Sequence, residues 1–377
     1  MINKPLQLLI AIVIILAAIF YIESTKPKQS DVVSVERIAV QKVERTNTSA
    51  SSTTATNSTD RTQILKEKSL KYSSAIELIP GGGFINTAPF TLKSLIGKKV
   101  ILVDFWTYSC INCLRTLPYL KSWYSKYKDK GLVIVGVHTP EFDFEKDYNN
   151  VLKATKDLGV EYPVVQDNDY ATWSAYHNQY WPHEYLIDID GYIVDDHIGE
   201  GGYTDTEAAI QKALSERAAV LGLDKISQMP IGLPKDVISV DSSRVGSPEM
   251  YFGSARNEYL GNGVVGRAGT QTLVVPKNLE TNKIYLGGEW SIQDQFAESK
   301  NSGGEIDLKY NSQNVYFVGS SKDGVSAAVY LDGTKVKTIF IKDNKLYDVV
   351  SGTDYGVHTI KMIVDKPGLS AFTFTFG

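Results

Sequence analysis

The stretch VDFWTYSCINCLRTLPYL, residues 103–120, decides the fold of this 377-residue chain. Residues 99–106, KVILVDFW, form an almost continuous apolar run and predict a buried strand. Apolar residues then recur at helical spacing, which predicts a helix from Cys110 to about Tyr127 with a kink at Pro118. The two cysteines of the chain, Cys110 and Cys113, therefore fall at the junction between a strand and a helix.

The position of the cysteine pair indicates its chemistry. A thiolate at the start of a helix accepts free backbone N–H groups and is stabilised by the positive end of the helix dipole. We therefore expect Cys110 to be the exposed nucleophile and Cys113, one turn further on, to be the buried resolving cysteine. Attack by Cys110 on a disulfide, followed by displacement by Cys113, is thiol–disulfide exchange. No cofactor is expected beyond the Cys110–Cys113 disulfide itself.

Other uses of a C-x-x-C unit fit the sequence less well. Covalent haem attachment requires a histidine after the second cysteine, where this chain has Leu114. Structural zinc needs further ligands, but the chain has no other cysteine and its histidines are scattered, so no metal site is predicted. Copper delivery stays open. A thiol peroxidase is the runner-up enzyme, because Thr107-x-x-Cys110 matches part of the peroxiredoxin pattern, although Val103 stands where that pattern has proline.

The pattern around the cysteines predicts an α/β domain over residues 76–222. Further strands are expected at 132–137 and 163–165, and a hairpin at 185–195 turns through residues 188–191. Helices are expected at 144–158, 171–177 and 204–221. Strands that alternate with helices and end in a hairpin and a helix predict a mixed sheet covered on both faces.

The character of the sequence changes after residues 223–236, which contain two prolines and one glycine and are predicted to be a linker. Over residues 237–377, apolar residues alternate at period two between turns such as Asp323-Gly324 and Asp332-Gly333. The final run places Phe372, Phe374 and Phe376 on one face. We predict an antiparallel, jelly-roll-like β-sandwich. A tethered binding protein that uses this sandwich is the non-enzymatic alternative.

The N-terminus predicts export. After Lys4, an apolar run from Leu6 to Ile22 is interrupted only by Gln7 and would be about 25 Å long as a helix. Residues 1–24 are therefore expected to be a transmembrane anchor, with a cleaved signal peptide as the alternative. The Ser-, Thr- and Asn-rich residues that follow predict a disordered tether over 25–75. We expect the folded domains on the extracytoplasmic side of the cell membrane, where disulfides persist. The near balance of 39 basic and 43 acidic residues argues against nucleic-acid binding.

Residues 76–222 resemble a thioredoxin-fold protein of the TlpA-like, extracytoplasmic branch. The active-site stretch quoted above is similar to that of DipZ proteins, and so are HTPEFDFEKD, DNDYATWSAY, YWPHEYLIDIDG and the closing FTFTFG. The resemblance thus covers both predicted domains. DipZ proteins usually carry a CcdA-type membrane domain that passes electrons outward. With one predicted span, this chain would receive electrons from a separate CcdA-like protein and pass them to protein disulfides.

The resemblance also implies roles for residues outside the cysteine pair. Asp104 occupies the place of the buried acid behind the cysteines in thioredoxins, where its raised pKa would let it relay a proton for Cys113. Pro182 matches the cis-proline beside the dithiol, which leaves the backbone of Trp181 free to pair with substrate. Glu141 resembles a second acidic residue near the site in TlpA-like reductases, and Arg115 is expected in solvent.

Two implications are less direct. Ile111-Asn112 replaces the Gly-Pro dipeptide of thioredoxin and contains no histidine, which favours a reductant over a strong oxidant. The sandwich resembles carbohydrate-binding modules, whose exposed aromatic side chains hold the apolar faces of sugar rings. The candidate aromatic residues for such a glycan site are Tyr251, Tyr285, Trp290, Tyr310, Tyr316 and Tyr347.

Overall fold

The computed structural model describes residues 53–224, 230, 232–234, 237 and 239–377. The predicted anchor, residues 1–24, lies outside these residues, and so does part of the predicted linker. Among the helices that are described, none is both long and apolar enough to cross a membrane.

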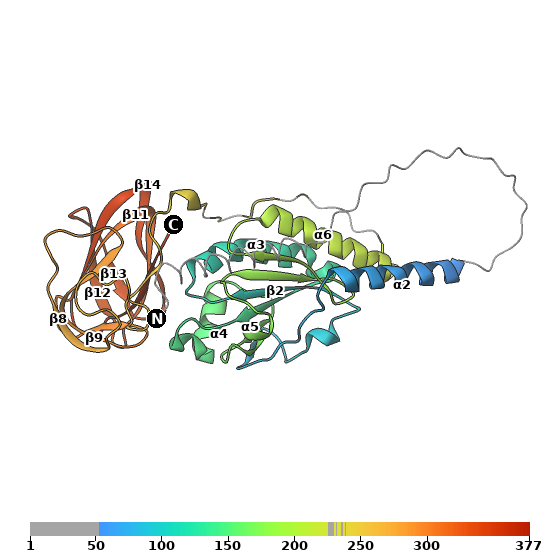
Figure 1. The fold of residues 1–377 in the computed structure, drawn as a ribbon, viewed down its shortest axis with the longest axis horizontal. Helices are drawn as coiled ribbons and strands as arrows, with labels where there is room; N and C mark the ends of the chain where they lie inside the picture. Colours follow the sequence, from blue (N-terminus) through green and yellow to red (C-terminus); the bar gives the residue numbers. More distant parts are fainter. Residues whose placement is uncertain (1–52, 225–229, 231, 235–236, 238) are drawn as a thin grey trace, which may run out of the picture. The chain divides into compact units, whose positions relative to one another are not determined.

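A six-stranded mixed sheet forms the framework of the first domain (Figure 1). The strand order is β1-β4-β3-β2-β5-β6, in which β2, β3 and β4 run parallel and the other strands are antiparallel to their neighbours. The strands are β1 (Phe84–Ile85), β2 (Val100–Trp106), β3 (Leu132–His138), β4 (Val164–Gln166), β5 (His183–Ile187) and β6 (Ile193–Ile198). All seven residues of β2 are buried, as expected for a central strand with both faces covered.

Helices cover both faces of this sheet, as the alternation of strands and helices predicted. Helices α3 (Ile111–Tyr127) and α6 (Tyr203–Val220) lie side by side on one face (Figure 1), where the rings of Tyr119 and Tyr203 stack with centroids 3.5 Å apart. Helix α4 (Tyr148–Asp157) adds Val151 to the same apolar cluster. Helix α5 (Ala171–Ala175) packs Trp173 against the opposite face. Short 3-10 turns occur at Leu92–Ser94, Lys128–Lys130 and Asp143–Lys146.

The helix predicted over residues 144–158 is divided in the structure. A 3-10 turn ends at Lys146, and α4 begins at Tyr148. Between them, Asp147 has an extended backbone and its side chain accepts the N–H groups of Asn149 and Asn150 at 2.7 and 3.3 Å. An aspartate that caps a helix in this way fixes where the helix starts, so apolar spacing alone placed the start too early.

The disordered tether predicted over residues 25–75 is wrong for residues 53–75. Residues Thr53–Lys71 form helix α2, and Ser74 bridges to Tyr192 beside β6. The Nζ atom of Lys68 bonds Asp188 at 2.6 Å and Asp190 at 2.8 Å, and it also bonds Glu216 of α6. The partners of Lys68 lie more than a hundred residues away in the sequence, so composition gave no sign of this anchoring.

The C-terminal region is rich in strands, as predicted. Its strands form one continuous antiparallel sheet of nine strands, where two separate sheets were expected. They are β7 (Met250–Tyr251), β8 (Gly269–Leu273), β9 (Lys283–Ile292), β10 (Ala297–Ser299), β11 (Glu305–Ser320), β12 (Val325–Leu331), β13 (Thr334–Ile341), β14 (Lys345–Val364) and β15 (Ser370–Phe376). Strands β11 and β14 are 16 and 20 residues long and contain register shifts, which bend a strand and let one sheet enclose a core.

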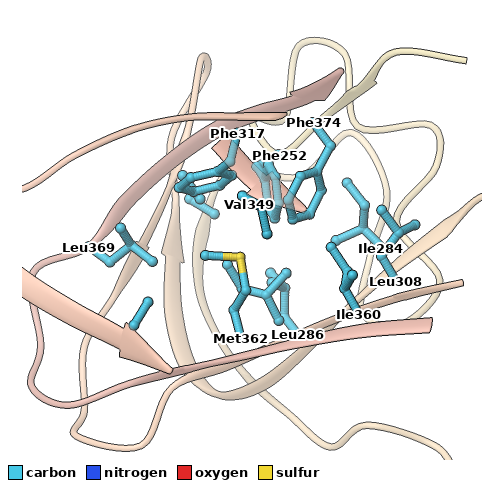
Figure 2. Packing of buried hydrophobic residues seen from close by; sticks show 14 of the residues in the cluster. Phe252, Ile284, Leu286, Leu308, Phe317, Val349, Ile360, Met362, Leu369 and Phe374 are labelled. Atoms are coloured by element: carbon cyan, nitrogen blue, oxygen red, sulfur yellow. The ribbon is translucent and has the colours of Figure 1, made fainter. Parts of the chain in front are cut away.

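The enclosed core is apolar, with Phe252, Phe317 and Phe374 meeting Met362 and Leu286 (Figure 2). Phe372 departs from the predicted alternation of β15. The pairing with β11 passes from Thr373 directly to Ala371, so Phe372 is the extra residue of a bulge. It packs instead against Phe142 and Phe144 of the first domain, with centroid distances of 5.1 and 4.8 Å.

The six aromatic residues proposed for glycan binding do not form an open platform. Four of them are buried: Tyr285, Trp290, Tyr310 and Tyr316. Tyr251 and Tyr347 are half-buried, and their hydroxyls are bonded to Glu141 and to the carbonyl of Asp343. Period-two alternation indicated that these side chains share the pattern of a sheet, but not which of them face the core.

Candidate active site

The two cysteines occupy the positions that the sequence predicted for them. Cys110 is the N-cap residue of α3, and its Sγ accepts the backbone N–H of Cys113 at 3.5 Å. Both thiols are free. Cys110 is half-buried, whereas the side chain of Cys113 is 1% exposed. A substrate disulfide can therefore reach only the sulfur of Cys110, and Cys113 can act only after that first attack.

The peptide bond Trp181-Pro182 is cis, as predicted. The thiol of Cys110 donates to the carbonyl oxygen of Trp181 at 3.9 Å, so this turn lies against the dithiol. The Trp181 indole N–H donates to the carbonyl of Thr139 at 3.1 Å, and its ring lies 4.3 Å from that of Trp173. These contacts hold the backbone of Trp181 beside the reactive sulfur, where an incoming chain would meet it.

Asp104 lies behind the cysteines on the face of β2 that α3 covers. Residues alternate along a strand, and Leu102 and Trp106 on either side of Asp104 pack in the same cluster as Cys113. Asp104 is 1% exposed, and neither carboxylate oxygen has a hydrogen-bond partner among the described residues. Burial raises its pKa to about 8. A carboxyl group in this state exchanges a proton near neutral pH, as the resemblance implied.

Cys113 needs such a group. Burial raises the pKa of the Cys113 thiol, and the hydrogen bond with Cys110 raises it further. A thiol must lose its proton before it attacks a disulfide. Asp104 is a buried ionisable group on the same face of β2 as Cys113, so it lies where a proton acceptor for this step would be needed.

Glu141 lies in the same cleft as Cys110, but its contacts are to the C-terminal region. The cleft measures about 440 Å³, and residues of both regions line it, among them Cys110, Trp181, Glu141 and Tyr251. The Glu141 carboxylate accepts from the Tyr251 hydroxyl at 2.8 Å and from Nη1 of Arg256 at 2.9 Å. The predicted acidic residue Glu141 therefore lies in the cleft beside Cys110, and its carboxylate is paired with Arg256.

A buried glutamate that the sequence did not single out supports the turn before Cys110. The Glu145 carboxylate accepts from Oγ of Ser109 at 2.6 Å and from the backbone N–H groups of Glu141 and Phe142 at 2.6 and 3.0 Å. Burial raises the pKa of Glu145 to about 7, although the bond from Ser109 lowers it. The hydroxyl of Ser109 directly before Cys110 was the available signal, because a buried hydroxyl needs a hydrogen-bond partner.

Arg115 is not in solvent as expected, since it is 4% exposed. Its Nε and Nη2 atoms bind the Glu200 carboxylate at 2.7 and 2.9 Å, and Nη2 also donates to Asn112 between the two cysteines at 2.6 Å. These hydrogen bonds of the Arg115 guanidinium hold the first turn of α3 to the segment that follows β6. A bidentate pair of this kind is geometrically specific, and only the folded chain brings its members together.

Two separate parts of the chain match known protein families. Residues 97–193 match the family described as "Thioredoxin-like". Residues 247–377 match the family described as "Thioredoxin like C-terminal domain".

Individual proteins and solved structures are similar to parts of this chain. The chain is 37% identical over 300 residues to the protein DipZ of Mycobacterium tuberculosis, a match that covers 78% of this chain and 41% of DipZ. It is 29% identical over 126 residues to the thiol-disulfide oxidoreductase YkuV of Bacillus subtilis, which covers 33% of this chain and 84% of YkuV. The solved thioredoxin domain of a thiol-disulfide oxidoreductase from Bacteroides vulgatus is 26% identical, with a TM-score of 0.31, and the match covers 37% of this chain and 96% of that one.

Proposed function

We propose that this chain is a thiol–disulfide oxidoreductase acting on protein disulfides, and the matches of residues 97–193 and 247–377 to thioredoxin-like families support this proposal. The observation that carries the proposal is the arrangement of the dithiol. Cys110 is reachable at the N-terminus of α3, Cys113 is buried one turn on, and Asp104 lies behind it.

The reaction proceeds in two exchanges. The Cys110 thiolate attacks one sulfur of a substrate disulfide, which forms a mixed disulfide and releases the first substrate thiolate, and that thiolate takes up a proton from water. Cys113 then passes its proton to Asp104 and attacks Cys110. The mixed disulfide breaks, the Cys110–Cys113 disulfide forms, and the second substrate thiolate leaves and takes up a proton from water. The substrate disulfide is reduced and the dithiol is oxidised.

We further propose that the chain works as a reductant on the extracytoplasmic side of a membrane. The absence of histidine between the cysteines supports the reductive direction, and the apolar run Leu6–Ile22 supports membrane attachment. The resemblance to DipZ supports a CcdA-like membrane protein as the electron donor. This chain spans 41% of DipZ, and the dithiol that such a donor would reduce lies within the matched residues.

Trapping tests the activity. The Cys113→Ser variant should accumulate mixed disulfides with a reducible protein such as insulin, because the first exchange occurs and the second cannot. Cys110→Ser is the matched control and should accumulate none, since the buried Cys113 does not reach substrate. Mixed disulfides that form equally through either cysteine, or through neither, would overturn the proposal.

The standard potential of the Cys110/Cys113 couple tests the direction. A value near the ~−270 mV of thioredoxin supports a reductant, and a value near the ~−120 mV of DsbA would contradict one. Equilibration against glutathione and against thioredoxin brackets this range, with the oxidised fraction read by alkylation of the free thiols.

A further inference from the structure

A row of ionisable side chains crosses the sheet behind the dithiol. Asp104 on β2 is directly opposite Glu184 on β5, and Glu184 is directly opposite His197 on β6. Residues that face each other in antiparallel strands lie on the same side of the sheet, with Cβ atoms about 4.5–5.5 Å apart. Because Asp104 faces Cys113, Glu184 and His197 lie on this side too. The row leads from the centre of the sheet to its edge, since β6 is the last strand.

Each member of the row has an unpaired polar atom. Asp104 and Glu184 are 1% and 2% exposed, and His197 is half-buried. Both oxygens of Asp104, Oε2 of Glu184 and Nε2 of His197 have no hydrogen-bond partner within the described part of the chain. Buried polar atoms in folded proteins are nearly always paired. Four such atoms on three neighbouring side chains are therefore a feature that requires a physical reason.

The resolving step supplies one. Asp104 must release the proton that it takes from Cys113 before the next turnover, yet its oxygens are buried. On the β3 side its register partner is Gly136, which has no side chain, and the indole nitrogen of Trp106 lies 2.7 Å from the point where a Cβ would be. On the β5 side its partner is Glu184. Of the two residues that pair with Asp104, only Glu184 has an acid–base side chain. A path for the proton therefore continues only across β5 toward β6.

We propose that Glu184 and His197 form a proton relay that carries the proton of Cys113 from Asp104 to the solvent at the edge of β6. This inference rests on the proposed function. When Cys113 attacks the mixed disulfide, its proton moves to Asp104. Glu184 accepts it from Asp104 and passes it to the imidazole of His197, which releases it to water, either directly or across bridging water molecules.

The electrostatics of the pair favour transfer. Two carboxyl groups this close resist holding two negative charges, so they share protons as one unit. Burial raises the pKa of Glu184 well above its usual range, and the nearby Asp104 and Asp195 raise it further. The other ionisable groups that face the row are Asp195 of β6, Tyr203 at the start of α6, and Tyr162 before β4. Burial raises the pKa of both tyrosines, so they stay protonated and do not compete for the proton.

Glu184→Gln tests the relay, because glutamine keeps the shape of the side chain but cannot accept a proton. The rate of the second exchange is measured in a single turnover from a preformed Cys110 mixed disulfide across pH 5 to 9. We expect that rate to fall by about tenfold, less than the 10²–10⁴ of a group that acts on the reacting atom itself, and its pH profile to change shape. The rate at which Cys110 is alkylated should stay at the wild-type value.

Glu207→Gln is the matched control. Glu207 is also a buried carboxylate of this domain, but it binds Lys126 and Tyr127 and lies outside the row. Its variant should keep the wild-type pH profile of the second exchange. At the other end of the row, His197→Ala should slow the second exchange, and added imidazole should restore the rate.

The outcomes separate the two proposals. A Glu184→Gln variant that resolves the mixed disulfide at the wild-type rate and with the wild-type pH profile overturns the relay and leaves the proposed function intact. Equal slowing in Glu184→Gln and Glu207→Gln also overturns it, because the effect would then come from loss of a buried charge in general. A wild-type chain that forms no mixed disulfide overturns the proposed function and the relay together.

Discussion

The two faces of strand β2 are both buried but have opposite properties. On one face, Ile101, Val103 and Phe105 meet only apolar and aromatic partners. On the other face, Asp104 lies between apolar neighbours with both oxygens unpaired within the described residues. The first face stabilises the domain. The second face lowers stability, because burying an unpaired carboxyl group is unfavourable, and it holds the carboxyl group that we propose as the proton acceptor for Cys113.

The largest effect should follow from changing Cys110, the more exposed cysteine of the pair. Cys110→Ser is expected to abolish disulfide exchange, because the buried Cys113 cannot reach substrate. In the wild-type chain, iodoacetamide should label Cys110 well before Cys113, and mass spectrometry of the labelled peptide would show this order. Faster labelling of Cys113 would contradict the assignment of roles.

A change on the apolar face should affect stability and not chemistry. Phe105 is fully buried and makes edge contacts with the rings of Trp173, Tyr176 and Tyr185. Phe105→Ala is expected to lower the free energy of unfolding by about 3–5 kcal/mol, measured by urea denaturation. The Cys110 alkylation rate of the folded fraction should stay unchanged. A large change in that rate would show that the two faces are not separable.

Asp104→Asn should do the reverse, raising stability while slowing the second exchange. The pKa of Asp104 rises from 3.8 in the unfolded chain to about 8 in the folded one. The folded state thus binds more protons between these values, so the wild-type chain loses stability as pH rises from about 4 to about 8. The variant lacks this loss. We expect it to be more stable by a few kcal/mol at pH 8 and by almost nothing at pH 4.

Denaturation of both proteins at pH 4, 6 and 8 checks this prediction. The difference in the free energy of unfolding should grow steadily with pH. A difference that is constant with pH, or that has the opposite sign, would show that ionisation of the buried Asp104 does not lower the free energy of unfolding.

The smallest effect is expected at the turn that joins β2 to α3. Ser109→Ala removes one of the donors to the buried Glu145 carboxylate and should lower the free energy of unfolding by about 1–2 kcal/mol at pH 8. The loss should shrink below pH 7, because the pKa of Glu145 is about 7 and its protonated form depends less on the donor. Ser109→Thr keeps the hydroxyl and serves as the control. Equal losses in both variants would point to packing as the cause.

Much of the first domain and its site follows from local sequence. The apolar run of β2, the helical spacing after Cys110 and the Trp181-Pro182 pair each carry their own signal, and the structure has the strand, the helix and the cis bond at those residues. The order of strands along the chain was also sufficient to predict a mixed sheet covered on both faces. These features rest on periodicity and on residue type, which a single sequence contains in full.

Other features were missed because they depend on residues far apart in the chain. Helix α2 is anchored by Lys68 to Asp188 and Asp190, and the bulge at Phe372 is visible only in its pairing with β11. The proposed glycan-binding aromatic residues were assigned by type, but burial of four of them is decided by how one sheet folds around its core. Alternation tells which residues share a face and not which face is inside.

The sequence by itself determined that Cys110 lies at the start of a helix, that Cys113 lies one turn behind it and that Asp104 belongs to the strand beneath them. Only the tertiary structure decided what surrounds Asp104, because Glu184 and His197 become its neighbours through strand register, and register is a long-range property. In the same way, Arg115 meets Glu200 only after the sheet and α3 have packed. The reacting residues are thus encoded locally, whereas the charges and proton acceptors around them arise from pairing between distant segments.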